Sequence, residues 1–382
     1  MSDAIEEPPL DGTPLVPVAD VDAVPAFPRA IEIRDLDWPQ LRTACDAAAI
    51  RARMPTIVER MEGLLDRDGG PGMLFDRARE TPGDRVIRVA GEAEPLWIIG
   101  DLHGDVLALE AALALIHRED PTPRIVFLGD FVDDEGLALE VLVRVFELIV
   151  ATPDRICVIA GNHDEALSFD GNRFASSVSP SDFSDFLNSN PADQGIVRTA
   201  KVALRLTAHA PRALFLPEGL LIAHGGFPLV DLHPALEENR DWNDPACLSD
   251  FVWARAHPKA RRKLPNRFSR GSQFGYEDFA DFCALATRLD RPVTHMVRGH
   301  DHVEDRYAVY PAYRAHPILT TVALSRRLPR EAFGSYERAP TLARVVPGSL
   351  PQVYQLHPPV ELIHAVFPQP LIDAPAAEDV SG

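Results

Sequence analysis

The clearest pattern along the chain is a short apolar run that ends in a polar motif containing glycine. Runs that end near residues 99, 128, 160, 223 and 297 lead into GDLHG, GDFVD, GNHD, HGG and RGH. Between the first runs, apolar residues recur every three or four positions, from Val106 to Ile116 and from about Leu137 to Val150, as in amphipathic helices. Strand-like runs that alternate with helical patterns predict β-α-β units. Ligands in such folds bind beyond the carboxyl ends of the strands, so we expect the motifs to share one edge.

The first motif illustrates the local geometry that the pattern implies. The run from Leu96 to Ile99 has the composition of a buried strand, and it stops at Gly100. Glycines at positions 100 and 104 allow the backbone to bend sharply there. Asp101 and His103 are two residues apart, and residues at that spacing on an extended segment point the same way. One carboxylate and one imidazole are therefore expected to face a common point.

The same pattern divides the chain into four parts. Residues 1–30 hold six prolines and six acidic residues, which predicts a disordered or loosely docked tail. Helical spacing predicts a helical extension over 31–80. The alternating strands and helices predict one domain over 81–367 that carries all five motifs. Residues 368–382 are rich in alanine, proline and acidic residues and are expected to form a flexible tail.

Bulk composition limits the class of partner. The chain of 382 residues has a formal net charge of -19, and such a surface repels the nucleic-acid backbone. No apolar stretch approaches the length of about 20 residues that a bilayer-spanning helix needs, and the amino terminus lacks a signal-peptide pattern. The four cysteines lack CxxC spacing, and Cys157 and Cys283 lie in apolar runs, as expected of buried free thiols. We therefore expect a cytoplasmic protein that binds neither nucleic acid nor membrane.

The motif residues together form a ligand set for two divalent transition ions. Imidazole mixed with carboxylate suits manganese, iron, zinc or cobalt, with manganese as our first expectation, whereas oxygen-only sets suit magnesium or calcium. Two ions held about 3.5–4 Å apart need a shared anionic bridge, and we assign this role to Asp130. The expected ligands of the first ion are Asp101, His103 and Asp130, and those of the second are Asp130, Asn162, His224 and His300. Taken singly, His224 fits a core histidine, Asn162 fits a left-handed turn, and His302 competes with His300 as the local ligand.

The order of the five motifs resembles the calcineurin-like metallophosphoesterase superfamily. More narrowly, RGSQFGYEDFADF (270–282), RGHDHVEDRYAVYP (298–311) and LTTVALS (319–325) resemble stretches of the serine/threonine phosphoprotein phosphatase (PPP) family. The resemblance runs from about residue 95 to 325. It implies an α/β fold with a central β-sandwich flanked by helices, and both metal ions at one edge of the sandwich.

The resemblance also implies roles for individual residues. His163 would be the catalytic general acid, oriented by Asp133. This agrees with the chemistry, because the leaving oxygen needs a proton, histidine titrates near neutrality, and a carboxylate on its second nitrogen fixes the tautomer. Arg270 matches the family's second phosphate-contacting arginine, and Arg298 and Asn162 are further candidates for phosphate binding. Arg270 ends a basic run within 231–275, a segment of weak periodicity that we interpret as long loops.

One motif departs from the family. The family reads GDxxDRG, in which the arginine clamps the phosphate, whereas this chain reads GDFVDDEG and places Asp134 and Glu135 there. Each carboxylate would repel a phosphate dianion by about a kcal/mol or more in a partly desolvated site. Either another cation compensates or the substrate differs.

The leading hypothesis is a dinuclear metal-dependent phosphomonoesterase of the protein phosphatase type. Its substrate would be a phosphorylated protein or a small phosphoester, its nucleophile a water molecule between the two ions, and His163 its general acid. A phosphodiester or dinucleoside polyphosphate hydrolase is the alternative that the missing arginine favours, because a diester carries one charge less. A phosphate-sensing or scaffold protein that keeps the metals but has lost turnover is the alternative outside enzymes.

Overall fold

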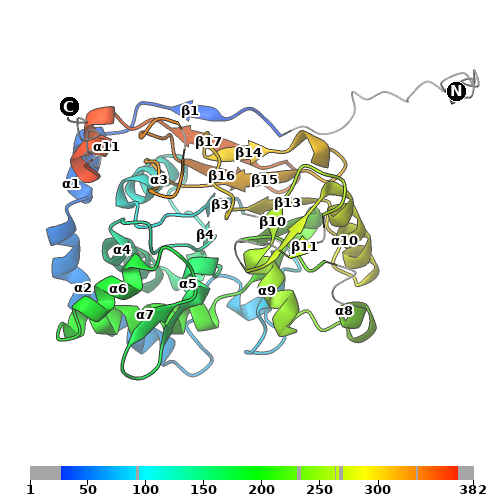
Figure 1. Ribbon diagram of the computed structural model, residues 1–382, viewed down its shortest axis with the longest axis horizontal. Helices are drawn as coiled ribbons and strands as arrows, with labels where there is room; N and C mark the ends of the chain where they lie inside the picture. Colours follow the sequence, from blue (N-terminus) through cyan, green and yellow to red (C-terminus); the bar gives the residue numbers. More distant parts are fainter. Residues whose placement is uncertain are drawn as a thin grey trace, which may run out of the picture.

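The fold is known from a computed structural model that describes residues 27–91, 94–229, 234–262, 264–265, 270–332 and 334–368. Most of the two expected tails, residues 1–26 and 369–382, lies outside this part of the chain. Two six-stranded sheets pack face to face, and helices cover both outer faces (Figure 1). This arrangement confirms the expected α/β fold with a central sandwich.

The first sheet carries three of the motif strands side by side. Its order is β1 (Ile31–Ile33), β17 (Gln352–Leu356), β16 (Thr341–Val345), β3 (Leu96–Ile99), β4 (Ile125–Phe127) and β5 (Ile156–Val158). Strands β3, β4 and β5 are parallel. Their carboxyl ends therefore meet at one edge, as the sequence pattern predicts.

The second sheet carries the other two motif strands. Its order is β14 (Tyr307–Val309), β15 (Ile318–Thr321), β13 (His295–Arg298), β9 (Leu220–Ala223), β8 (Ala213–Phe215) and β2 (Val86–Arg88). Strands β9 and β13 are parallel neighbours. Alternate residues of each strand face the space between the sheets, where Ile98, Val126, Ile222 and Val297 belong to one buried apolar cluster.

Helices flank the sandwich in two groups. On the first sheet and its surroundings lie α1 (Trp38–Ala44), α2 (Ala47–Leu65), α3 (Val106–Glu119), α4 (Ala138–Ala151), α5 (Asn162–Ala166), α6 (Asp182–Ser189), α7 (Gln194–His209) and α11 (Val360–Val366). The second group contains α8 (Pro234–Asn239), α9 (Pro245–Trp253) and α10 (Tyr276–Arg288). Short 3-10 turns occur at Asp76–Ala78, Pro153–Arg155, Pro217–Gly219 and Pro311–Tyr313. Within the described ranges, no helix has both the length and the apolarity to cross a bilayer.

The described residues within 231–275 form more regular structure than the weak periodicity of this segment predicts. It contains α8, α9 and a small sheet of β10 (Arg255–Ala256), β12 (Ser272–Phe274) and β11 (Leu264–Pro265), while another small sheet pairs β6 (Leu167–Phe169) with β7 (Phe174–Ser176). Asp244 caps α9 by accepting hydrogen bonds from the backbone N–H groups of residues 246 and 247. The expectation of long loops is wrong here because elements of two to nine residues are too short to show a period.

Residues 31–80 pack directly against the motif-bearing part of the chain. The sequence pattern predicts helix from residue 31, but Ile31–Ile33 forms β1 because its backbone pairs in parallel with β17 at the edge of the first sheet. Helix α2 buries Ile50, Met54, Val58 and Met61 in the same apolar cluster as α4 and α7. The segment therefore completes the helical layer over the first sheet.

Truncation of one buried side chain of α2 tests this packing. Met61 is fully buried, so Met61→Ala should lower the free energy of unfolding of the full chain by about 2–5 kcal/mol, measured by urea denaturation. The neighbouring exposed residue Arg60 provides the control. Arg60→Ala should change the free energy of unfolding by about 0.5 kcal/mol or less. Equal, small effects of the two substitutions would contradict the packing of α2.

Candidate metal centre

Five strand ends bring six side chains to one buried point. Asp101 and His103 follow β3, Asp130 follows β4, and Asn162 begins α5 just after β5. His224 and His300 follow β9 and β13 of the second sheet. None of the six is more than 4% exposed. The structure thus unites all the residues that the sequence predicts as metal ligands.

The backbone is strained at three of these residues. His103, Asp130 and His300 have φ values of 37°, 54° and 68°, in the left-handed region that non-glycine residues rarely adopt. A side chain at Gly299 would place its Cβ only 2.1 Å from Asp101 Oδ1, so that position requires glycine. Strain of this kind persists only where the surrounding structure enforces it, and it concentrates at functional sites.

One group of donor atoms surrounds the Nε2 atom of His224. This nitrogen lies 3.3 Å from Asp130 Oδ2, 3.1 Å from Asn162 Oδ1 and 3.1 Å from His300 Nδ1. The other ring nitrogen of His224, Nδ1, donates to the backbone oxygen of Leu128 at 2.9 Å. In the neutral ring Nε2 therefore carries a lone pair, which faces other electron-rich atoms. A cation between them would remove the repulsion, so these four residues fit a metal ion.

A second group contains the first predicted set and one further histidine. His103 Nε2 lies 3.6 Å from Asp130 Oδ2, and His103 Nδ1 donates to the backbone oxygen of Val132 at 2.8 Å. His302 Nε2 lies 3.1 Å from Asp101 Oδ2, so Asp101, His103 and His302 can hold an ion together. Asp130 groups with His224 and His300, and it also groups with His103 and His163, so it lies between the two candidate sites as a bridging ligand must.

The sequence contains a signal for His302 that the predicted ligand set leaves out. His300 and His302 are two residues apart, which is the spacing that links Asp101 to His103. In the structure the two histidines divide between the two candidate groups, so both can serve as ligands at once.

The electrostatics of the centre differ from one imidazole to the next. Burial lowers the pKa values of His103 and His300 well below the usual range, and neighbouring positive groups act in the same direction. These imidazoles are therefore neutral, which is the state that binds metals. Burial also opposes the charging of His224, but Asp130 and Asp101 outweigh it and raise its pKa to about 9. A field that favours a proton at His224 Nε2 also favours a metal ion there.

His163 lies beside the two groups with its ring fixed by a carboxylate. Its Nδ1 is 2.7 Å from Asp133 Oδ2, and the other oxygen of Asp133 accepts a hydrogen bond from the backbone N–H of Phe183. Burial lowers the pKa of His163, but Asp130 and the hydrogen bond that His163 donates to Asp133 outweigh this and raise it above the usual value. This geometry can keep a proton on an imidazole that faces the centre.

The two arginines predicted to bind phosphate lie in different settings. Arg298 is fully buried, and it donates to the backbone oxygens of Gly225 and Ala254 and to Asp301 and Thr320. The donors of Arg298 are thus used within the protein. The expected contact between Arg298 and phosphate is wrong, and the residue instead supports the structure next to His300.

Arg270 is exposed and lies over the ring of Trp253, 5.2 Å from its centroid. The indole of Trp253 donates to Glu165 at 3.0 Å, so Arg270 lies near helix α5, which also carries His163. Its role in phosphate binding stays a prediction.

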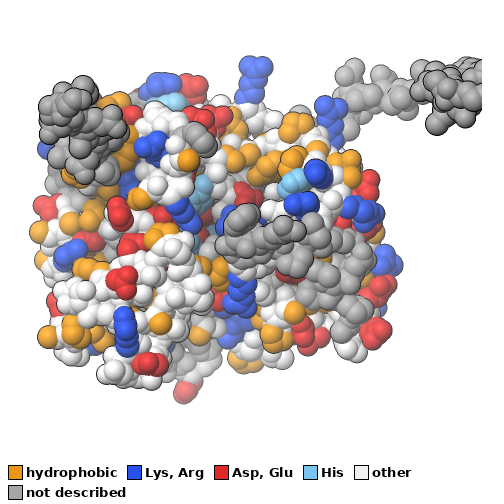
Figure 2. All heavy atoms as spheres, in the orientation of Figure 1, with side chains coloured by type: hydrophobic (Ala, Val, Ile, Leu, Met, Phe, Trp, Pro, Cys, Tyr) orange, Lys and Arg blue, Asp and Glu red, His pale blue; other side chains and the backbone are white. Residues whose placement is uncertain are grey.

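A cavity of about 550 Å³ opens over the centre and is bounded by arginines. Its lining includes His300, His302, Arg255, Arg306, Arg330 and Arg338. Figure 2 shows histidine and arginine or lysine side chains near the middle of the corresponding face. Arg330 lies beyond the last motif, and no local pattern marks it, so sequence reasoning missed it.

Comparisons with known proteins agree with this geometry. A model of the calcineurin-like phosphoesterase family matches residues 94–304. The chain is 24% identical over 230 residues to serine/threonine-protein phosphatase 5 of Homo sapiens, covering 57% of this chain and 41% of that protein. It is 28% identical over 195 residues to the catalytic subunit of serine/threonine-protein phosphatase 6 of Drosophila melanogaster, covering 50% and 60%. The matched part thus spans about half the length of these relatives.

A solved structure shares the fold. It is a protein serine/threonine phosphatase from Saccharomyces cerevisiae with similarity to human phosphatase PP5. The TM-score is 0.52 at 16% sequence identity, with 80% of this chain and 89% of that chain covered.

The placement of His302 predicts the metal content of a variant. His302→Ala should weaken the group formed with Asp101 and His103 while sparing the group around His224. After gel filtration, elemental analysis should find about two ions per chain in the parent protein and about one in the variant. His364→Ala on α11 is the matched control and should keep the parent content. A full complement of metal in His302→Ala would contradict the role of His302.

Proposed function

The chain belongs to the calcineurin-like phosphoesterase family and is a phosphoester hydrolase, and we propose that it is a dinuclear phosphomonoesterase of the protein phosphatase type. The observation that carries the proposal is that Asp130 groups with His224 and His300 on one side and approaches His103 of the group with Asp101 and His302 on the other, with the His163–Asp133 pair adjoining. Such a pair of groups suits the transfer of a phosphoryl group from an ester oxygen to water.

The chain's own residues divide the work of the reaction. Two bound ions would supply Lewis-acid charge and make a water molecule nucleophilic at neutral pH. Asp130 and Asn162 help to position the phosphoryl group by fixing the shape of the centre. His163 holds a proton at Nε2 for the leaving oxygen, while Asp133 fixes its orientation through Nδ1.

The metal and the compartment are part of the same proposal. Four imidazoles and two carboxylates among the candidate ligands favour a transition ion, so we propose manganese first, with iron, zinc or cobalt as alternatives. All four cysteines are buried free thiols, which confirms the expectation for Cys157 and Cys283. Free thiols suit a reducing compartment, and we propose the cytoplasm.

Two esters that differ in their leaving group test the role of His163. A serine alkoxide needs a proton to leave, whereas p-nitrophenolate is a far better leaving group. His163→Ala should therefore lower kcat about 100-fold to 10,000-fold on a phosphoserine peptide and less on p-nitrophenyl phosphate. Asp130→Asn should abolish manganese-dependent turnover of both. Equal losses on the two esters in His163→Ala would contradict proton donation, and metal-independent turnover of the parent would contradict the whole proposal.

A phosphodiester or dinucleoside polyphosphate hydrolase is the second candidate. It is favoured by Asp134 and Glu135, which stand where the family carries its clamp arginine. Relative rates on p-nitrophenyl phosphate, bis-p-nitrophenyl phosphate and a diadenosine polyphosphate separate the candidates, and the leading proposal expects the monoester to be preferred. Metal-loaded protein that hydrolyses none of them would instead support a phosphate-sensing or scaffold role.

A further inference from the structure

The loop that departs from the family motif is a well-built part of the centre. Asp133, Asp134 and Glu135 all have positive φ values, of 69°, 63° and 59°. The carboxylate of Asp182 accepts hydrogen bonds from the backbone N–H groups of Asp134 and Glu135, both at 2.9 Å. The side chain of Asp134 is completely buried and turns inward, with Oδ2 3.2 Å from His103 Nδ1. A buried carboxylate of this kind needs a positive partner.

Arg330 supplies that partner from a distant segment. Its Nη2 lies 2.9 Å from Asp134 Oδ2 and 3.2 Å from His103 Nε2. Its Nη1 lies 3.3 Å from His163 Nε2. The guanidinium therefore contacts a metal ligand and the proposed general acid at once. Its side chain is still 33% exposed and lines the cavity over the centre.

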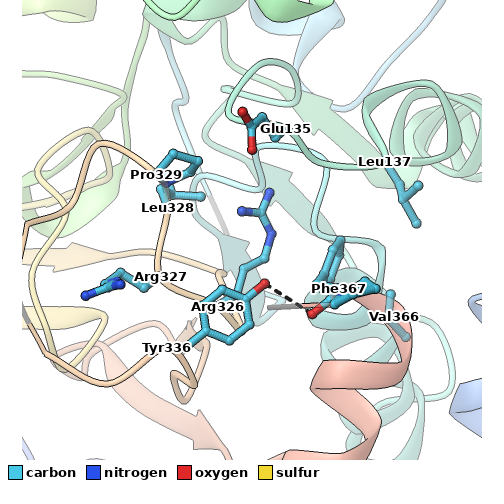
Figure 3. A pocket seen from close by; sticks show the side chains of 10 residues that line it. Glu135, Leu137, Arg326, Arg327, Leu328, Pro329, Tyr336, Val366 and Phe367 are labelled. Atoms are coloured by element: carbon cyan, nitrogen blue, oxygen red, sulfur yellow. Dashed lines mark hydrogen bonds between the residues drawn. The ribbon is translucent and has the colours of Figure 1, made fainter. Parts of the chain in front are cut away.

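Hydrogen bonds hold the residues that precede Arg330 in the chain. The backbone N–H of Ser325 donates to Asp105 Oδ2 at 2.7 Å. Arg326 Nη2 donates to the backbone oxygen of Asp134 at 2.7 Å, and Figure 3 shows its side chain pointing toward Glu135. Residues 326–329 line a neighbouring cavity of about 510 Å³, so the segment forms a wall between two cavities.

The residue after Arg330 is fastened to the centre itself. Glu331 accepts hydrogen bonds from Arg306 at 2.6 and 2.9 Å, and its Oε1 lies 3.3 Å from His302 Nδ1. The backbone around Arg330 is thus held by Arg326 on one side and Glu331 on the other. Asp134 orients its guanidinium before any ligand binds. Preorganisation of this kind lowers the entropic cost of binding.

We propose that Arg330 binds the phosphoryl oxygens of the substrate, in place of the clamp arginine that this chain lacks at Asp134. Among the other arginines that line the cavity, Arg255 pairs with Asp301 and Arg306 pairs with Glu331. Arg330 alone among these described residues reaches both His103 and His163, between which a phosphoryl group must lie. On binding, phosphate oxygens accept hydrogen bonds from the guanidinium, while Asp134 keeps it in place. The inference rests on the proposed function, because it assigns the substrate to the same site.

Binding of inorganic phosphate to the metal-loaded full chain tests the proposal without turnover. Calorimetry should find that Arg330→Ala weakens phosphate binding at least tenfold, because a charge-assisted bidentate contact is lost. The phosphate affinity of Arg330→Lys should lie between those of the parent protein and Arg330→Ala, since lysine keeps the charge but not the planar guanidinium. Arg327→Ala is the control from the same segment, because Arg327 lies in the neighbouring cavity, and it should bind phosphate within twofold of the parent. Metal content should equal the parent value in all three variants.

Each other outcome has a defined meaning. If Arg330→Ala binds phosphate as tightly as the parent protein or more tightly, the proposal is overturned. Tighter binding would mean that the Arg330 side chain blocks access of phosphate to the centre. Loss of metal from Arg330→Ala would also overturn it, because Arg330 would then support the ligands. If the parent protein binds phosphate through Arg330 but hydrolyses no phosphoester, the proposed function fails and this assignment stands.

Discussion

The structure depends on one constraint, which is that nitrogen and oxygen donors from the strand ends of both sheets are buried together around Asp130. Imidazole nitrogens and carboxylate and amide oxygens approach one another to 3.1–3.6 Å in a region without exposed surface. In a low-dielectric interior such contacts are costly unless a cation lies among them. Both sheets direct strand ends to this point, and the left-handed backbone at three ligands shows that the surrounding fold holds them there. A cation bound among these donors would offset the cost of burying them together, so metal loading should stabilise the folded chain.

Charge around the centre is balanced by residues that are distant in sequence. The loop after β4 contributes the buried carboxylate of Asp134, and the segment after β15 returns an arginine to it. Glu331 beside that arginine joins Arg306 to His302. A chain whose formal net charge is -19 thus presents a locally basic cavity over its metal-ligating residues. The local electrostatic potential of the cavity, rather than the net charge of the chain, determines which ligands can enter it. Its arginine lining suits an anionic substrate.

Sequence reasoning succeeded where a signal is contained in one short segment. An apolar run that ends in a motif such as GDLHG fixes both the strand and the position of the polar side chains that follow it, so the convergence of the candidate ligands from Asp101 to His300 could be predicted. It failed where a role depends on tertiary contacts. Arg298 and Arg330 both lie near the centre, but only the fold shows that the first is enclosed by backbone carbonyls while the second lines the cavity. Strand β1 was missed for the same reason, since its partner β17 is more than 300 residues away in sequence.

The central claim is that the donors around Asp130 hold two ions. The most direct measurement is anomalous X-ray diffraction from crystals of the manganese-loaded protein. The account predicts two anomalous peaks about 3.5–4 Å apart, with the carboxylate of Asp130 between them. A single peak, or metal bound elsewhere while this centre stays empty, would contradict it.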